Sequence, residues 1–225
     1  MAGDTKKRIM DESLRLFSEK GYDSVSMTEI ASAVGIKAPS IYKHYPSKKG
    51  ILDAIVEETF ARYEHFAGAY GLNGSDPVFD ASIYGKMDEE CLRNLALSTV
   101  RLFKEDRFLG SFRKMVSIDR YCNPEMSRLY KQLFIDTPLG YQSRLFSVLF
   151  PDRDPMMLAM RFFLPVIHLM ELCDIGQLDD EMLYSYVSEL TGSFYRDMAA
   201  GERSPYPAVQ SNKNVGEDPH VKKGE

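Results

Sequence analysis

Helix start and stop signals follow one another closely between residues 21 and 47, and they limit the fold more than any other feature. Gly21 comes directly after an apolar periodic segment, where a left-handed glycine ends a helix. The segment Ser26–Glu29 is a capping box, so a second helix begins there. Gly35 ends that helix, and Pro39 suits the first turn of a third. Three short helices joined by tight turns are therefore predicted, before Ser47 caps a fourth.

Apolar residues recur at helical spacing around these signals. One face of the first helix is expected to carry Ile9, Ser13, Leu16 and Phe17. The stripe of the fourth helix is expected to carry Leu52, Ile55, Val56, Phe60 and Tyr63. Val25 and Ile30 flank the capping box in the positions of a hydrophobic staple, which fixes the entry into the second helix.

Charge is distributed unevenly along the chain, although the net charge is −5. Residues 1–50 carry nine Lys and Arg against six Asp and Glu, a surplus of three positive charges. The remaining residues carry 19 against 27. A basic module on an acidic body is consistent with local attraction to phosphate.

Two short helices joined by a glycine turn, with a supporting helix before them, form a helix-turn-helix, whose second helix enters the major groove of DNA. In the segment 35–48 (GIKAPSIYKHYPSK), Ile36, Ile41 and Tyr45 have near-helical spacing and are expected to face inward. The outer face is then left with Lys37, Ala38, Ser40, Tyr42, Lys43 and His44. Hydroxyls, lysines, an aromatic ring and a small apolar group suit phosphate and base-edge contacts.

Residues 5–51 resemble the TetR family of bacterial regulators, most closely in IMDESLRLF (9–17), SMTEIA (26–31) and SIYKHYPSK (40–48). The resemblance implies DNA contacts by Thr28, Lys37, Ala38, Pro39, Ser40, Tyr42, Lys43, His44 and Lys48. Thr28, Ser40, Tyr42 and Lys48 would reach the phosphate backbone. Lys37 departs from the Ser or Thr that usually caps the third helix, a loss of about 1 kcal/mol, and would instead contact a phosphate or guanine.

The rest of the sequence reads as helical, with breaks expected at 71–77, around 122–124 and around 151–155. We therefore expect an all-α fold, with an N-terminal three-helix helix-turn-helix DNA-binding domain (1–50) and a larger helical effector-binding and dimerisation domain (51–200). The tail 201–225 lacks apolar periodicity and is expected to be disordered.

Two long helices are expected at 156–175 and 179–199, the first after the cap pair Asp154-Pro155 and apolar nearly all round. The resemblance implies that they pair with their twofold mates in a homodimer; internal packing in a monomer is the alternative. The expected interface comprises Met160, Ile167, Leu183, Tyr186, Val187, Leu190 and Phe194.

The resemblance also implies a cavity for a small-molecule effector, largely hydrophobic, among the middle helices at 86–104, 108–118 and 124–150. The candidates for its lining are Phe103, Phe112, Met115, Tyr130, Phe134, Phe163 and His168. Aromatic and methionine stripes at helical spacing also occur in plain hydrophobic cores, and this alternative stays open for each residue.

Other classes of function find no support in the sequence. It has no phosphate-binding glycine loop, nucleophile elbow or paired metal-ligand spacing, so no enzyme, cofactor or metal site is expected. No signal peptide is visible, and charged residues and Pro165 interrupt the apolar segment 156–172. A cytoplasmic protein without membrane contact is therefore expected, associated with the nucleoid when it is bound to DNA. The leading hypothesis is a homodimeric repressor of a palindromic or near-palindromic operator, released by an effector; an activator or a helical ligand-binding adaptor is the alternative.

Overall fold

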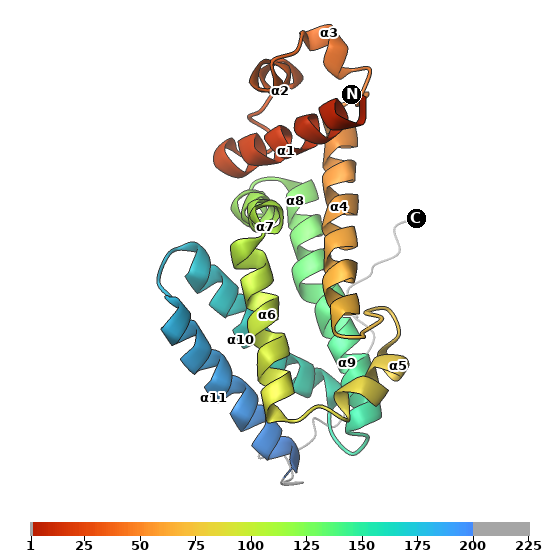
Figure 1. Ribbon diagram of the computed structural model, residues 1–225, viewed down its shortest axis with the longest axis vertical. Coiled ribbons are helices and arrows are strands. Elements are labelled where there is room, and N and C mark those ends of the chain that lie inside the picture. Colours follow the sequence, from red (N-terminus) through yellow and green to blue (C-terminus); the bar gives the residue numbers. More distant parts are fainter. Residues whose placement is uncertain (1, 200–225) are drawn as a thin grey trace, which may run out of the picture.

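The computed structural model describes residues 2–199, and every regular element in this range is a helix (Figure 1). This confirms the all-α fold expected from the sequence. The tail 201–225, expected to be disordered, lies outside the described residues.

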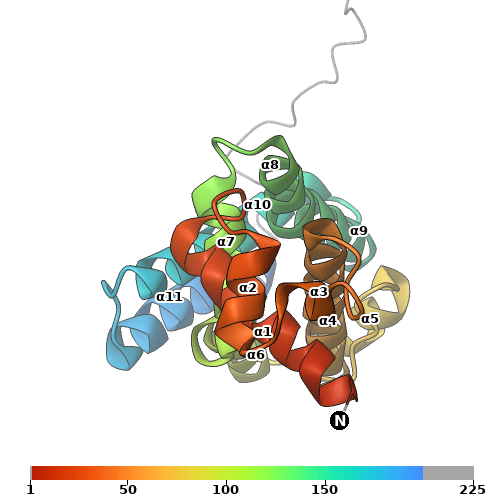
Figure 2. The same cartoon turned by 90° about the horizontal axis from the view of Figure 1, so that it is seen from above.

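The first three helices form one end of the molecule, which we call the head (Figures 1 and 2). They are α1 (Ala2–Lys20), α2 (Met27–Val34) and α3 (Ala38–Ile41). The start and stop signals act as predicted: Gly21 and Gly35 have φ of 85° and 76°. The hydroxyl of Ser26 accepts a hydrogen bond from the backbone N–H of Glu29 at 3.1 Å.

The remaining helices form the body. They are α4 (Lys48–Ala69), α5 (Pro77–Tyr84), α6 (Glu89–Glu105), α7 (Arg107–Asp119), α8 (Pro124–Lys131), the π-helical turn η1 (Gln132–Asp136), α9 (Thr137–Leu149), α10 (Pro155–Asp174) and α11 (Asp180–Ala199). Most begin at a side chain that accepts hydrogen bonds from first-turn N–H groups: Ser47, Asp76, Asp88, Asp106, Asn123 and Asp154. The three breaks expected from the sequence are confirmed. The π-helical turn was not predicted.

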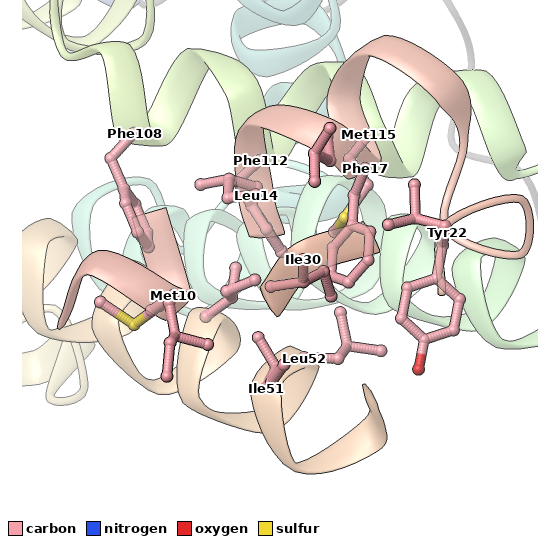
Figure 3. Packing of buried hydrophobic residues seen from close by; sticks show 14 of the residues in the cluster. Met10, Leu14, Phe17, Tyr22, Ile30, Ile51, Leu52, Phe108, Phe112 and Met115 are labelled. Carbon is pink, nitrogen blue, oxygen red and sulfur yellow. The ribbon is translucent and has the colours of Figure 1, made fainter. Parts of the chain in front are cut away.

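Head and body share one hydrophobic core. Leu14 and Phe17 of α1 are buried with Leu52 of α4 and with Phe112 and Met115 of α7, and Figure 3 shows these side chains converging. In Figure 1, α4 runs from the head along the body, and α7 lies directly beneath α1. The head therefore packs directly on α4 and α7 of the body.

A second buried cluster joins α6, α9, α10 and α11. Helix α10 is long and apolar enough to cross a membrane by length and composition alone, with a mean hydropathy of 1.6. It nevertheless packs against α6, α9 and α11, and a third of that stretch is buried. As expected, α10 is packed on several sides, although Met156, Met157, Met160 and Leu164 remain 39–45% exposed.

Candidate nucleic-acid interface and ligand cavity

The α2–turn–α3 unit lies at the outer end of the head (Figures 1 and 2). Lys37 occupies the N-cap of α3 in an extended conformation and makes no side-chain capping bond, as its residue type led us to expect. Regular α-helix ends at Ile41, earlier than predicted. Tight turns continue the path, because the N–H groups of His44 and Tyr45 both donate to the carbonyl of Ile41 at 3.0 Å.

The inward and outward faces of α3 are largely as predicted. Ile41 and Tyr45 are buried and Ile36 is half-buried. The candidate DNA-contacting side chains are exposed at Thr28, Lys37, Pro39, Tyr42 and Lys43, and half-buried at Ala38, Ser40, His44 and Lys48. Tyr42 is 53% exposed, so its ring and hydroxyl are accessible to a partner.

Lys48 differs from its expected role. Its ammonium donates to the carbonyl of Tyr22 at 2.9 Å, of Val25 at 3.1 Å and of Asp23 at 3.3 Å. It also lies 4.5 Å from the centre of the Tyr22 ring. All three N–H donors are therefore engaged, and Lys48 fastens the loop between α1 and α2 to the start of α4 rather than standing free for a phosphate.

The acidic side chains of the head are largely neutralised within the chain. Lys7 pairs with Asp11, and Arg15 pairs with both Glu12 and Glu19. Lys20 pairs with Glu29, and this hydrogen bond lowers the pKa of the Glu29 carboxyl.

Two cations near α3 have no such partner. In the described part of the chain, the side chains of Lys37 and Lys43 make no hydrogen bond or ion pair. Lys6 of α1, which the sequence analysis did not single out, lies 5.3 Å from the centre of the Tyr45 ring and adds a third positive charge close by. Three positively charged side chains thus lie close to α3.

Polar contacts bind the head to α7 and α8. The backbone N–H of Tyr22 donates to the Asp119 carboxylate at 2.6 Å. The Asn123 side-chain amide donates to Asp23 at 2.8 Å. Within the body, Lys49 at the start of α4 and Glu125 of α8 form an ion pair at 2.6 Å.

A cavity of about 170 Å³ lies in the body. It is lined by residues of α4, α5, α6, α7, η1, α9 and α10, and by Leu72 and Gly74 of the loop before α5. Of the predicted effector residues, four line it: Phe103, Phe112, Phe134 and Phe163.

The other three effector candidates lie elsewhere. Met115 is fully buried in the core shared with the head. The Tyr130 ring is stacked on Phe134, with the guanidinium of Arg120 at 4.3 Å from its centre. His168, expected amid apolar neighbours, has a side chain that is 69% exposed and lies 3.5 Å from the Glu171 carboxylate. Its position on the outer face of α10 removes it from the cavity.

Comparison with known proteins identifies the head. The profile of the family described as "Bacterial regulatory proteins, tetR family" matches residues 9–55. Over 55 residues the chain is 46% identical to the biofilm operon icaADBC HTH-type negative transcriptional regulator IcaR of Staphylococcus aureus (strain Newman). Residues 9–55 therefore match the DNA-binding part of the TetR family. This alignment covers 24% of the chain and 30% of the relative, so the chain matches under a third of that relative's length.

Solved structures extend the TetR likeness to the body. A TetR-like transcriptional regulator from Rhodococcus sp. RHA1 has a TM-score of 0.61 at 17% identity, covering 88% of this chain and 97% of that one. A transcriptional regulator from Saccharomonospora viridis, in complex with choline, has a TM-score of 0.55 at 19% identity, covering 85% and 95%. At these identities the likeness shows a common fold.

The residues expected at a TetR-type dimer interface divide into two groups. Leu183, Val187 and Phe194 are buried in the chain's own core, so they are unavailable to a second chain. That expectation is corrected, because helical periodicity identifies an apolar face without saying what covers it. Met160 and Tyr186 are 39% and 51% exposed. Ile167 and Leu190 are half-buried against the same core.

The polar part of the cavity was not predicted from the sequence. Tyr63 of α4, Tyr84 of α5 and Tyr141 of α9 all line it. Each is an isolated tyrosine on a different helix, so only the tertiary packing brings them together. Their spacing in the sequence follows no helical periodicity.

Proposed function

We propose that this chain is a homodimeric repressor that binds a palindromic or near-palindromic DNA operator and is released when a small molecule fills the body cavity. The observation that carries the proposal is the surface of α3. Lys37 and Lys43 lie there without internal partners, beside the exposed Tyr42 ring. DNA phosphates supply the missing countercharges, and the exposed hydroxyl supplies a directional contact.

In this proposal α3 enters the major groove. Ala38, Pro39 and Lys43 face the groove floor, with His44 at its edge. Thr28, Ser40 and Tyr42 bond phosphates, and Lys37 contacts a phosphate or a guanine. Lys48 acts indirectly, by holding the loop that precedes α2.

The exposed faces of α10 and α11 are proposed to bind the same faces of a second copy. Met156, Met160 and Leu164 are spaced four residues apart, so they form one stripe along α10. Tyr186 adds an exposed ring on α11. A twofold dimer fits a helix-turn-helix, because two recognition helices must reach successive major grooves about 34–36 Å apart.

Release of DNA on ligand binding is proposed to depend on movement of α4 and α7. Helix α4 starts at the head and lines the cavity with Thr59, Phe60 and Tyr63. Phe112 of α7 belongs to the core shared with the head and also lines the cavity. A ligand that shifts either helix changes the angle of the head and hence the spacing of the two recognition helices. Repression is supported by IcaR, a negative regulator, and ligand binding by the choline-bound neighbour.

The test is selection of bound sequences from a pool of randomised DNA duplexes, using the purified chain. We expect enrichment of a site with twofold symmetry. Tyr42→Ala, which leaves the core intact, should abolish enrichment. Phe79→Ala is the matched control, because Phe79 is a 50% exposed aromatic residue on α5, at the far end of the molecule from the head (Figure 1). Absence of enrichment, or enrichment by Tyr42→Ala equal to that of the wild type, contradicts the proposal.

A further inference from the structure

The cavity ends near a buried carboxylate. Asp80 of α5 has no exposed surface. Its oxygens accept hydrogen bonds from the backbone N–H groups of Asn73 at 2.7 Å and Gly74 at 2.9 Å, and from the hydroxyl of Tyr141 at 2.5 Å. Tyr141 lines the cavity, so one hydroxyl group separates the carboxylate from the cavity space.

No cation balances this carboxylate within residues 2–199. Asp80 forms no ion pair with any described Lys, Arg or His. The residues that line the cavity include no Lys, Arg or His either. Buried carboxylates are usually paired with a positive charge, because leaving water is costly for an ion. Asp80 therefore carries a buried negative charge that no ion pair neutralises among the described residues.

Three of the polar side chains that line the cavity already donate their protons within the chain. The hydroxyls of Thr59 and Thr99 donate to the carbonyls one turn earlier in their own helices, at 2.8 Å each. The Tyr141 proton is directed at Asp80. The side-chain oxygen of Gln142 is buried without a partner among the described residues. Each of these oxygens keeps lone pairs, so it can accept a hydrogen bond from a ligand.

The tyrosines stay neutral and present their rings. Burial raises the pKa of the Tyr63, Tyr84 and Tyr141 hydroxyls, and the nearby Asp80 carboxylate raises those of Tyr84 and Tyr141 further. Their aromatic faces carry negative electrostatic potential, which attracts cations. The walls beyond them are apolar, with Phe60 and Phe66 among the lining residues.

We propose that the ligand of this cavity is an organic ammonium ion: an apolar body carrying a protonated amine, with its nitrogen at the Tyr63–Tyr84–Tyr141 end beside Asp80. The inference rests on the proposed function in taking this cavity as the effector site. A protonated amine donates hydrogen bonds to these oxygens and supplies a positive charge to balance Asp80. A carboxylate or phosphate ligand would place a second negative charge near Asp80 with no cation to balance it.

The test uses three probes of nearly equal shape: 4-phenylbutylamine, 4-phenylbutan-1-ol and 4-phenylbutanoate. Isothermal titration of the full chain without DNA measures binding alone. We expect the amine to bind at least tenfold more tightly than the alcohol, and the carboxylate to bind more weakly than both. Equal or tighter binding of the alcohol or the carboxylate overturns the proposal, as does absence of binding by all three at millimolar concentration.

Two variants locate the charge. Asp80→Asn and Tyr141→Phe should each weaken amine binding at least fivefold and change alcohol binding less than twofold. Tyr130→Phe, an aromatic residue outside the cavity lining, is the matched control and should change neither. If Asp80→Asn fails to fold, judged by circular dichroism, Tyr141→Phe decides alone. Amine affinity that is unchanged in Tyr141→Phe contradicts the assignment.

A separate assay distinguishes this inference from the proposed function. The amine is added to the complex of the chain with its selected DNA site. Amine binding without DNA release refutes release by ligand and leaves the ligand class intact. DNA binding without preferential amine binding refutes the ligand class and leaves the DNA-binding function intact.

Discussion

Replacing Lys48 by methionine removes the ammonium group that joins three carbonyls of the loop between α1 and α2 to the start of α4. Methionine retains much of the apolar stem, so the change isolates the charge and its hydrogen bonds. The contacts to Tyr22 and Val25 are part-buried, whereas the longer contact to Asp23 is exposed. The two part-buried contacts therefore determine most of the effect.

The expected loss of stability follows from these contacts. A hydrogen bond from a charged group contributes about 1.5–3 kcal/mol, and carbonyls freed at a surface recover part of this from water. The ring of Tyr22, 4.5 Å from the ammonium, adds about 0.5 kcal/mol at a partly exposed site. A net loss of about 2 kcal/mol is expected, which lowers the Tm of a chain of this size by roughly 4–8 °C.

Thermal unfolding and DNA titration in rising salt together test this reasoning, with Lys43→Met as the matched control. Lys48→Met should lower the Tm and leave the salt dependence of DNA binding unchanged below the melting range. Lys43→Met should keep the Tm and lower affinity for the selected site more than for unrelated DNA, because Lys43 is proposed to face the bases of the groove floor. A Lys48→Met protein with wild-type Tm and a reduced salt slope would refute the positioning role and restore Lys48 as a phosphate contact.

Three further changes have expected outcomes. In Gly35→Ala, an alanine must adopt φ of 76°, and its Cβ has no neighbouring atom within 4 Å to clash with. Backbone strain alone should therefore lower the free energy of unfolding by about 1–2 kcal/mol, measured by urea unfolding. An unchanged unfolding midpoint would contradict this. Burial raises the pKa of Asp106, but the N–H groups of Leu109 and Phe108 and the Arg62 guanidinium outweigh it and hold that pKa below its ordinary value of 3.8. A lowered carboxyl pKa contributes stability above the unfolded-state value and loses it as pH falls through the folded-state value. Asp106→Asn should therefore lower stability at pH 6 and reduce the further loss below about pH 4, and equal acid sensitivity in both proteins would exclude this contribution. Met160→Glu places a charge in the exposed α10 stripe and should convert dimers to monomers in sedimentation velocity without lowering helix content by circular dichroism; a persistent dimer would place the interface elsewhere.

The head could be predicted from the sequence because its structure depends on local rules. Gly21 and Gly35 take left-handed conformations that few other residues tolerate, and Ser26 caps α2 through a contact only three residues away. Lys37 was expected to leave α3 uncapped for the same local reason. Such signals need no knowledge of the rest of the fold.

Features that depend on tertiary packing were not predicted. The carbonyls bound by Lys48 lie 23 to 26 residues away, so no sequence spacing marks the contact. Leu183 and Val187 form a helical stripe, as expected, but the stripe faces α6 and the core of its own chain rather than a partner. Asp80 follows an expected break, and only the folded loop turns two N–H groups toward its carboxylate.

The central claim is that a twofold dimer reads DNA through α2 and α3. Changing the spacing of the two half-sites tests this claim most directly. Once a site has been selected, five base pairs are inserted at its centre, which turns one half-site by about half a helical turn, since a full turn is about 10–10.5 base pairs. Fluorescence anisotropy at fixed salt then compares the two duplexes. We expect affinity for the altered duplex to fall to that for unrelated DNA, with two chains bound to the original site. Equal affinity for both duplexes, or one chain per site, would contradict recognition by a twofold dimer.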